Sequence, residues 1–158
     1  MKSNLVIGGL IIAVVAVVGV MATQAFPQSI IAPEVAEVAT IYKSPSCGCC
    51  GQYAAYLEKK GYGVDVQGVA DMSQIKEQYG VPYELESCHT MEIGGYVVEG
   101  HIPEEAVQKL LIERPDIKGI GMAGMPSGSP GMPGPKTSDF VIYEIMHEGT
   151  KGDVFMTI

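Results

Sequence analysis

Residues 44–51 read Ser-Pro-Ser-Cys-Gly-Cys-Cys-Gly, and the rest of the chain is best interpreted from this stretch. It holds three of the four cysteines of the 158-residue protein, and the fourth, Cys88, is followed directly by His89. Bunched thiols of this kind favour a redox pair with spare thiols, or a thiolate metal site, over the denser disulfide framework of small secreted domains. We therefore expect the fold to bring Cys88 and His89 back to residues 47–50.

The cysteines follow a predicted strand and open a predicted helix. Val38–Lys43 is apolar and β-branched, as in a strand, and the proline at position 45 ends it. Ser46 is the expected N-cap of a helix from Gly48 to Lys60, whose buried stripe is spaced at i, i+3 and i+4: Tyr53, Tyr56 and Leu57. The positive end of the helix dipole stabilises thiolate over thiol, so it lowers the pKa of cysteines placed there.

The remaining elements alternate between helices and strands. In order they are a strand Gly63–Val69, a helix Met72–Tyr79, a hairpin of Met91–Ile93 and Tyr96–Glu99, a helix after Pro103, a loop Gly119–Lys136, and a closing hairpin of Phe140–Ile145 and Val154–Ile158. This order predicts one α/β domain over residues 38–158, with a central mixed sheet, flanking helices and a C-terminal hairpin. The first two strands should be parallel neighbours joined by a right-handed helical crossover.

Cys47 and Cys50 have the C-x-x-C spacing of a redox pair, and Cys49 lies between them. A dithiol enzyme needs two cysteines, and a third thiol would compete in disulfide exchange. In a metal site, by contrast, three sulfurs on one turn can share or bridge ions. Cys49 therefore favours metal binding, while disulfide exchange or a structural disulfide between Cys47 and Cys50 stays an alternative.

Cys88 and His89 add a fourth thiol and an imidazole. Thiolates, thioethers and imidazole together favour Cu(I), as one ion or several, with zinc as the alternative metal. A single cysteine is often buried and inert, so Cys88 is a candidate because His89 stands beside it. The predicted metal ligands are therefore Cys47, Cys49, Cys50 and Cys88, with His89 as a further candidate.

A loop rich in glycine, proline and serine supplies more soft ligands. Residues 119–136 contain six glycines and four prolines. The loop also has three thioether side chains, those of Met122, Met125 and Met132. Thioether sulfur stays neutral and suits Cu(I) in compartments that oxidise free thiols. These methionines and His101 are additional candidate ligands, although loop methionines more often fill the core and a loop histidine is more often only hydrogen-bonded.

The first residues predict export from the cytoplasm. Residues 5–22 are an uncharged apolar run after Lys2, long for the core of a signal peptide and short for a membrane span. We expect a membrane anchor or a signal peptide within residues 1–25, cleaved near Ala25 in the second case, and then a linker at residues 26–37. Lys2 favours a cytoplasmic N-terminus. The domain that follows the apolar run should therefore lie on the other side of the membrane, in the periplasm or at the cell surface.

The net charge of the chain indicates which classes of partner it can bind. The formal net charge is −8, and the sequence contains no basic cluster. Phosphate binding needs lysine and arginine, so nucleic acid is not an expected partner. An acidic surface instead suits the capture of cations.

Several motifs resemble the domain-of-unknown-function 411 family, also called CopG-like, in the same order over roughly residues 38–155. These motifs are Tyr42–Gly51, Ser87–Thr90, Gly94–Pro103 and Gly124–Met132. The resemblance implies a thioredoxin-like, exported, metal-binding domain associated with copper resistance. It implies metal or redox roles for the four cysteines. For His89, His101, Met125 and Met132 it implies only that they belong to the shared motifs.

Three functions are compatible with these features. The first is Cu(I) binding outside the cytoplasm, for sequestration, transfer to another copper-handling protein, or redox conversion of copper. The second is thiol–disulfide exchange by Cys47 and Cys50, and the third is a zinc or iron–sulfur protein. A thioredoxin-type enzyme usually has a cis-proline before its third strand, where this chain has Cys88-His89. We therefore expect a binding protein, and an oxidoreductase if the protein is an enzyme.

Overall fold

A strand, a helix and a second strand open the domain and place the cysteine turn at one end of a sheet. The computed structural model describes residues 37–158, in which β1 (Val38–Lys43) and β2 (Gly63–Gly68) are parallel neighbours joined by α1 (Gly48–Lys59). The predicted parallel pair and its helical crossover are confirmed.

The predicted N-cap of α1 is wrong by one residue. Cys47 is the N-cap, because its backbone is still extended, with ψ of 99°, and it makes no side-chain capping bond. The Ser46 hydroxyl oxygen instead lies 3.1 Å from the hydroxyl oxygen of Ser44. The first N–H groups of α1 are therefore not occupied by a serine cap.

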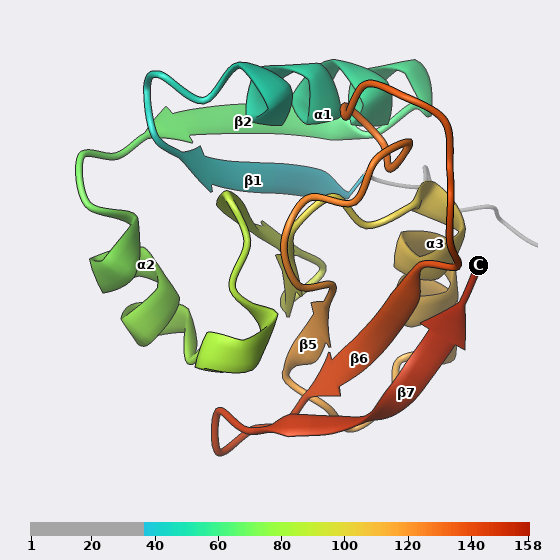
Figure 1. The fold of residues 1–158 in the computed structure, drawn as a ribbon. Coiled ribbons are helices and arrows are strands. Elements are labelled where there is room, and N and C mark those ends of the chain that lie inside the picture. Colours follow the sequence, from blue (N-terminus) through green and yellow to red (C-terminus); the bar gives the residue numbers. More distant parts are fainter. Residues whose placement is uncertain (1–36) are drawn as a thin grey trace, which may run out of the picture. The chain divides into compact units, whose positions relative to one another are not determined.

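Seven strands form one mixed sheet in the order β2-β1-β3-β4-β5-β6-β7 (Figure 1). The elements after β2 are α2 (Met72–Tyr79), the 3₁₀ turn η1 (Tyr83–Leu85), β3 (His89–Ile93), β4 (Tyr96–Glu99), α3 (Glu104–Glu113), β5 (Gly119–Gly121), β6 (Val141–Ile145) and β7 (Lys151–Thr157). β3 and β4 form one antiparallel hairpin, and β6 and β7 form the closing one. The mixed α/β fold is confirmed, while its likeness to thioredoxin stays a prediction.

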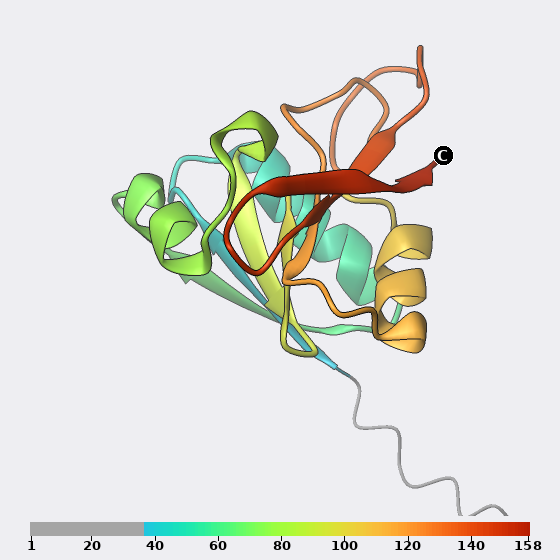
Figure 2. The same cartoon turned by 90° about the horizontal axis from the view of Figure 1, so that it is seen from below.

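The two faces of the sheet are covered by different helices. Ile41 of β1 belongs to the apolar core together with Tyr53 of α1 and Leu110 of α3. Tyr42, the next residue of β1, instead packs on Tyr79 of α2, with ring centroids 5.4 Å apart. Because successive strand residues point to opposite faces, α1 and α3 lie on one face and α2 on the other, as Figure 2 shows.

The long loop predicted at residues 119–136 is shorter than expected. Its first three residues form β5, which pairs in parallel with β4. A Cβ at Gly119 would overlap the carbonyl group of Val97, so glycine permits this close approach of two backbones. A strand of three residues with two glycines carries no sequence signal, which is why the prediction missed it.

The predicted membrane anchor or signal peptide precedes the residues that the structure describes. Among residues 37–158, no helix is both long and apolar enough to cross a membrane. The anchor or signal at residues 1–25 and nearly all of the linker at 26–37 lie outside the described residues. Both segments, and the location that they imply, stay predictions.

Candidate thiol and metal site

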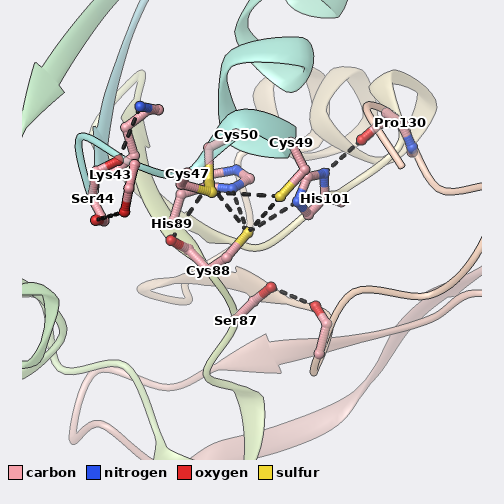
Figure 3. Close-up of a disulfide and its surroundings, with 12 residues drawn as sticks. Lys43, Ser44, Cys47, Cys49, Cys50, Ser87, Cys88, His89, His101 and Pro130 are labelled. Carbon is pink, nitrogen blue, oxygen red and sulfur yellow. Dashed lines mark hydrogen bonds between the residues drawn. A yellow bond between two sulfur atoms is a disulfide. The ribbon is translucent and has the colours of Figure 1, made fainter. Parts of the chain in front are cut away.

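The four cysteine sulfurs meet at the N-terminus of α1 (Figure 3). Cys47 caps the helix, Cys49 and Cys50 lie in its first turn, and Cys88 directly precedes β3. In the antiparallel pair of β1 and β3, Lys43 lies opposite His89, so the end of β1 and the start of β3 share one edge. The four sulfur atoms lie within 4.8 Å of one another. The fold therefore does bring Cys88 back to the cysteine turn.

Two of the four cysteines are oxidised in this structure. Cys47 and Cys50 form a disulfide with Cα atoms 5.5 Å apart, and Cys49 and Cys88 are free thiols. The Cys49 sulfur lies 3.5 Å from that of Cys47, and the Cys88 sulfur lies 3.3 Å from that of Cys50. Disulfide sulfurs are not thiolates, so the predicted set of four thiolate ligands exists only after reduction by two electrons.

Cys88 also belongs to a second set of potential ligands, with His89 and His101. One donor atom from each of these three residues lies within 4.8 Å of the others. The Cys88 sulfur is 3.5 Å from His89 Nδ1 and 3.0 Å from His101 Nε2. None of the three takes part in the disulfide, so this set is complete before and after reduction. Cys88 is shared by both sets.

A hydrogen bond on the ring nitrogen that does not face Cys88 fixes the tautomer of His101. His101 Nδ1 lies 2.6 Å from the carbonyl oxygen of Pro130. A carbonyl can only accept, so Nδ1 carries the proton and the neutral ring directs its Nε2 lone pair at Cys88. Burial also lowers the pKa of His101, which favours the neutral ring. A backbone carbonyl orients many metal-binding histidines in this way.

Tyr53 holds both imidazole rings against the cluster. Its ring centroid is 4.6 Å from that of His89 and 5.5 Å from that of His101, and its hydroxyl donates to the Ile102 carbonyl at 3.0 Å. Sequence reasoning placed Tyr53 in the buried stripe of α1 and missed this role. The available signal was its spacing, because Tyr53 lies three residues after Cys50 and so on the same face of the helix.

His89 is fully buried, and its Nε2 atom has no hydrogen-bond partner among residues 37–158. Burial lowers the pKa of His89 to about 3, and His101 and Lys76 add smaller effects. An unfolded histidine has a pKa near 6.5, so the unfolded state takes up the proton first as the pH falls. Stability that depends on neutral His89 is therefore complete above pH ~6.5 and is lost progressively toward pH ~3.

We expect the metal-free protein to lose stability below pH ~6.5 at about 1.4 kcal/mol per pH unit through His89. Urea unfolding between pH 6 and 4 measures this slope. His89→Gln should flatten it, because glutamine does not titrate. The exposed His147 is the matched control, and His147→Gln should keep the slope. Equal slopes for the wild type and His89→Gln would contradict the neutral burial of His89.

The Cys88 thiol has a different environment from the cysteines of the helix turn. Burial raises its pKa to about 12, and the neighbouring Cys49 adds to this effect. The Cys88 sulfur also lies near the N-terminus of α1, but the effect of burial on the pKa exceeds any stabilisation of the thiolate by the helix dipole. Without a metal, Cys88 is therefore a neutral thiol at pH 7, and a metal ion must displace its proton.

A buried ion pair holds the Cys88 segment in place. Glu99 of β4 is fully buried, and its carboxylate accepts bonds from the Ser87 N–H at 2.6 Å, from the Thr90 hydroxyl at 2.6 Å and from the Lys76 ammonium. Ser87 and Thr90 flank Cys88 and His89, so Glu99 fixes the backbone that carries both ligands. Sequence reasoning missed this pair. Its signal was an acid at the end of an otherwise uncharged strand.

The three loop methionines lie in different environments. Met122 is buried in the apolar core, Met125 is 50 % exposed and lines the same surface cleft as Cys88, and Met132 is partly buried. Gly131, with φ of +79°, lies so close to α1 that an added Cβ would be 2.9 Å from the Cys49 carbonyl oxygen. The loop therefore covers the cysteine turn, and direct ligation by its methionines stays a prediction.

Comparisons with known proteins identify one family and two similar solved structures. The family model described as "Protein of unknown function, DUF411" matches residues 85–132. The solved structure "Copper resistance protein copG- Form 2" is 36 % identical with a TM-score of 0.71, and the match covers 77 % of this chain and 98 % of that one. For "Copper resistance protein copG- Form 1" the identity is 36 %, the TM-score 0.70 and the coverage 77 % and 96 %. No curated protein matches the chain.

At this identity and coverage, the chain belongs to the DUF411 family of CopG-like proteins. This is the family that its cysteine, histidine and methionine motifs resemble.

Proposed function

We propose that the protein binds Cu(I) through its clustered thiolates and serves copper handling outside the cytoplasm. One observation carries the proposal: four sulfur atoms lie within 4.8 Å of one another. Thiolates and imidazoles select soft and borderline metals, chiefly Cu(I) and Zn(II). The two similar structures, both titled copper resistance protein copG, support copper over zinc or an iron–sulfur cluster.

The reduced cluster has donors for more than one ion. Cys47, Cys49 and Cys50 supply three sulfurs on one side of Cys88, and two histidines supply nitrogens beside it. Cu(I) needs only two to four ligands, and thiolate sulfur bridges readily between Cu(I) ions. We propose that Cys88 is the bridging ligand.

Redox conversion of copper fits the two states of Cys47 and Cys50. Two Cu(II) ions can each take one electron from these thiolates, which gives the disulfide and two Cu(I) ions. Cys49, Cys88 and the histidines then remain available to hold copper. Sequestration and transfer to another copper-handling protein are the other roles within the same proposal. The predicted anchor at residues 5–22, or cleavage near Ala25, would place the domain at the membrane or in the periplasm.

Thiol–disulfide exchange is the second candidate function, because Cys47 and Cys50 are found as a disulfide. Cys50 is fully buried and Cys47 is partly exposed. A partner's thiolate would therefore attack the Cys47 sulfur to form a mixed disulfide, and Cys50 would leave as a thiolate. A thioredoxin-like fold would suit such an oxidoreductase.

Cu(I) competition tests the proposed function. The reduced protein is titrated anaerobically with Cu(I) in the presence of a chelator of moderate affinity. We expect transfer of copper to the protein and a sulfur-to-copper charge-transfer absorption in the near ultraviolet. Absence of binding under these conditions would rule out the proposal.

Cys49→Ser separates metal binding from disulfide exchange. The substitution removes one thiolate from the cluster and neither partner of the disulfide. We expect Cu(I) affinity to fall by at least about tenfold, equivalent to about 1.4 kcal/mol. Thiol labelling should show that Cys47 and Cys50 still form their disulfide. If copper binding were unchanged, the third thiol of the turn would have no part in the metal site.

A further inference from the structure

A cleft of about 570 Å³ on the surface reaches Cys88, and its lining consists of Tyr83, Glu84, Glu86, Ser87, Cys88, Gly124 and Met125. Residues 83–88, which include η1, form one wall. Gly124 and Met125, in the loop that follows β5, form the other. The Ser87 hydroxyl donates to the Gly124 carbonyl, and the Gly124 N–H donates to the Glu86 carbonyl at 3.3 Å. These bonds join the two walls, so hydrogen bonds hold the shape of the cleft.

Cys88 connects this cleft with both sets of ligands. Of the six cysteine and histidine candidates, Cys88 is the one that lines the cleft. Cys50, His89 and His101 are instead fully buried. An ion that arrives through the cleft therefore meets the shared ligand first, and from there either set lies within one ligand exchange.

The chemistry of the lining suits an incoming soft cation. Met125 is 50 % exposed, so its thioether can be reached from solvent. Glu84 and Glu86 on the opposite wall are exposed carboxylates, and no lysine or arginine belongs to the lining. Negative charge raises the local concentration of cations, and thioether sulfur selects Cu(I) among them.

We propose that this cleft is the path by which Cu(I) enters the cluster, with Met125 as the first, transient ligand. The inference rests on the proposed function and adds the route of loading to it. Met125 Sδ binds Cu(I) as the donor molecule releases it. The Cys88 sulfur then forms its bond to copper as the thioether bond breaks, and the Cys88 thiol proton passes to solvent. Met125 is an access ligand and not a resident one.

Transfer kinetics of Met125→Leu test the route. The full-length, reduced protein is mixed anaerobically with Cu(I) bicinchoninate, and loss of the coloured chelate is followed by stopped flow. Leucine keeps the volume of the side chain and removes its sulfur. We expect the transfer rate to fall about tenfold, which corresponds to about 1.4 kcal/mol of barrier, with copper stoichiometry and affinity unchanged. Met72→Leu, a partly exposed methionine on α2 outside the lining, should transfer at the wild-type rate.

A second pair of variants tests the acidic wall. Glu84→Gln with Glu86→Gln should slow transfer and weaken its dependence on salt. Glu105→Gln with Glu148→Gln removes the same charge from exposed positions outside the cleft and should do neither.

The outcomes separate the route from the function. A wild-type transfer rate in Met125→Leu would overturn the route. A loss of affinity or of a bound ion in that variant would make Met125 a resident ligand and would also overturn it. A wild-type protein that takes up no Cu(I) at equilibrium would refute the proposed function itself.

Discussion

Cys88→Ser is expected to reduce Cu(I) affinity more than any other single cysteine replacement. The Cys88 sulfur lies 3.3 Å from that of Cys50, 3.9 Å from that of Cys49 and 3.0 Å from His101 Nε2, so its loss breaks both ligand sets. We expect affinity to fall by at least about a thousandfold, or about 4 kcal/mol. Competition with a Cu(I) chelator measures the change, and circular dichroism checks the fold.

Cys49→Ser is the matched control, because it removes a sulfur that belongs to one ligand set only. Both variants keep Cys47 and Cys50, so both can still form the disulfide. The loss in Cys88→Ser should exceed that in Cys49→Ser by about a hundredfold, or about 2.7 kcal/mol. Equal losses in the two variants would contradict the shared role of Cys88.

Among the substitutions proposed for this protein, Lys76→Met is expected to reduce the free energy of unfolding most. Lys76 is 5 % exposed and forms an ion pair with Glu99, which is fully buried. Burial already raises the pKa of Glu99 while Lys76 is present. Removing the lysine leaves the carboxyl group without its counter-ion, at a cost of about 3–5 kcal/mol in the free energy of unfolding. Urea unfolding of the metal-free protein measures this cost.

Two further variants show whether the cost comes from an unpaired buried charge. In Lys76→Met with Glu99→Gln, the glutamine carbonyl can still accept from the Ser87 N–H, and its amide NH2 can donate to the Thr90 hydroxyl oxygen, so most of the stability should return. Lys109→Met removes a partly exposed i,i+4 partner of Glu113 and should cost less than about 1 kcal/mol. Equal costs for Lys76→Met and Lys109→Met would contradict the buried ion pair.

The elements with strong local signals were predicted closely. The helix Met72–Tyr79 has the predicted bounds, because Asp71 caps it through the Ser73 N–H at 2.9 Å and Gly80 ends it at φ of +61°. The β3–β4 hairpin turns at Gly94 and Gly95, both with positive φ. In each case the residue that sets the backbone angle directly adjoins the element that it ends, so a local signal is sufficient.

Features that depend on distant partners were not predicted. Strand β5 has no propensity of its own and exists because β4 and β6 lie on either side of it. The carboxylate of Glu99 meets Lys76 across 23 positions of sequence. The acid at the end of an otherwise uncharged strand was the only local signal, and a lysine in an exposed helix gives none. Only the packing of α2 on β3 and β4 brings them together.

The candidate site was predictable where its residues are adjacent in sequence. The spacing of Cys47, Cys49 and Cys50 indicated one thiol cluster, and the Cys88-His89 pair indicated its completion. The sharing of Cys88 between two ligand sets depends on how His101 reaches the cluster from the turn after β4, which no periodicity encodes. The oxidation of Cys47 and Cys50 depends on redox conditions as well as on sequence.

Copper content in the two redox states tests the central claim most directly. Full-length protein is prepared anaerobically with Cys47 and Cys50 either reduced or as the disulfide, loaded with excess Cu(I), desalted and measured by elemental analysis. We expect more than one copper ion per chain in the reduced protein and fewer in the oxidised protein, with added Zn(II) unable to displace them. A reduced protein that retains no copper, or equal copper in both states, would contradict the account.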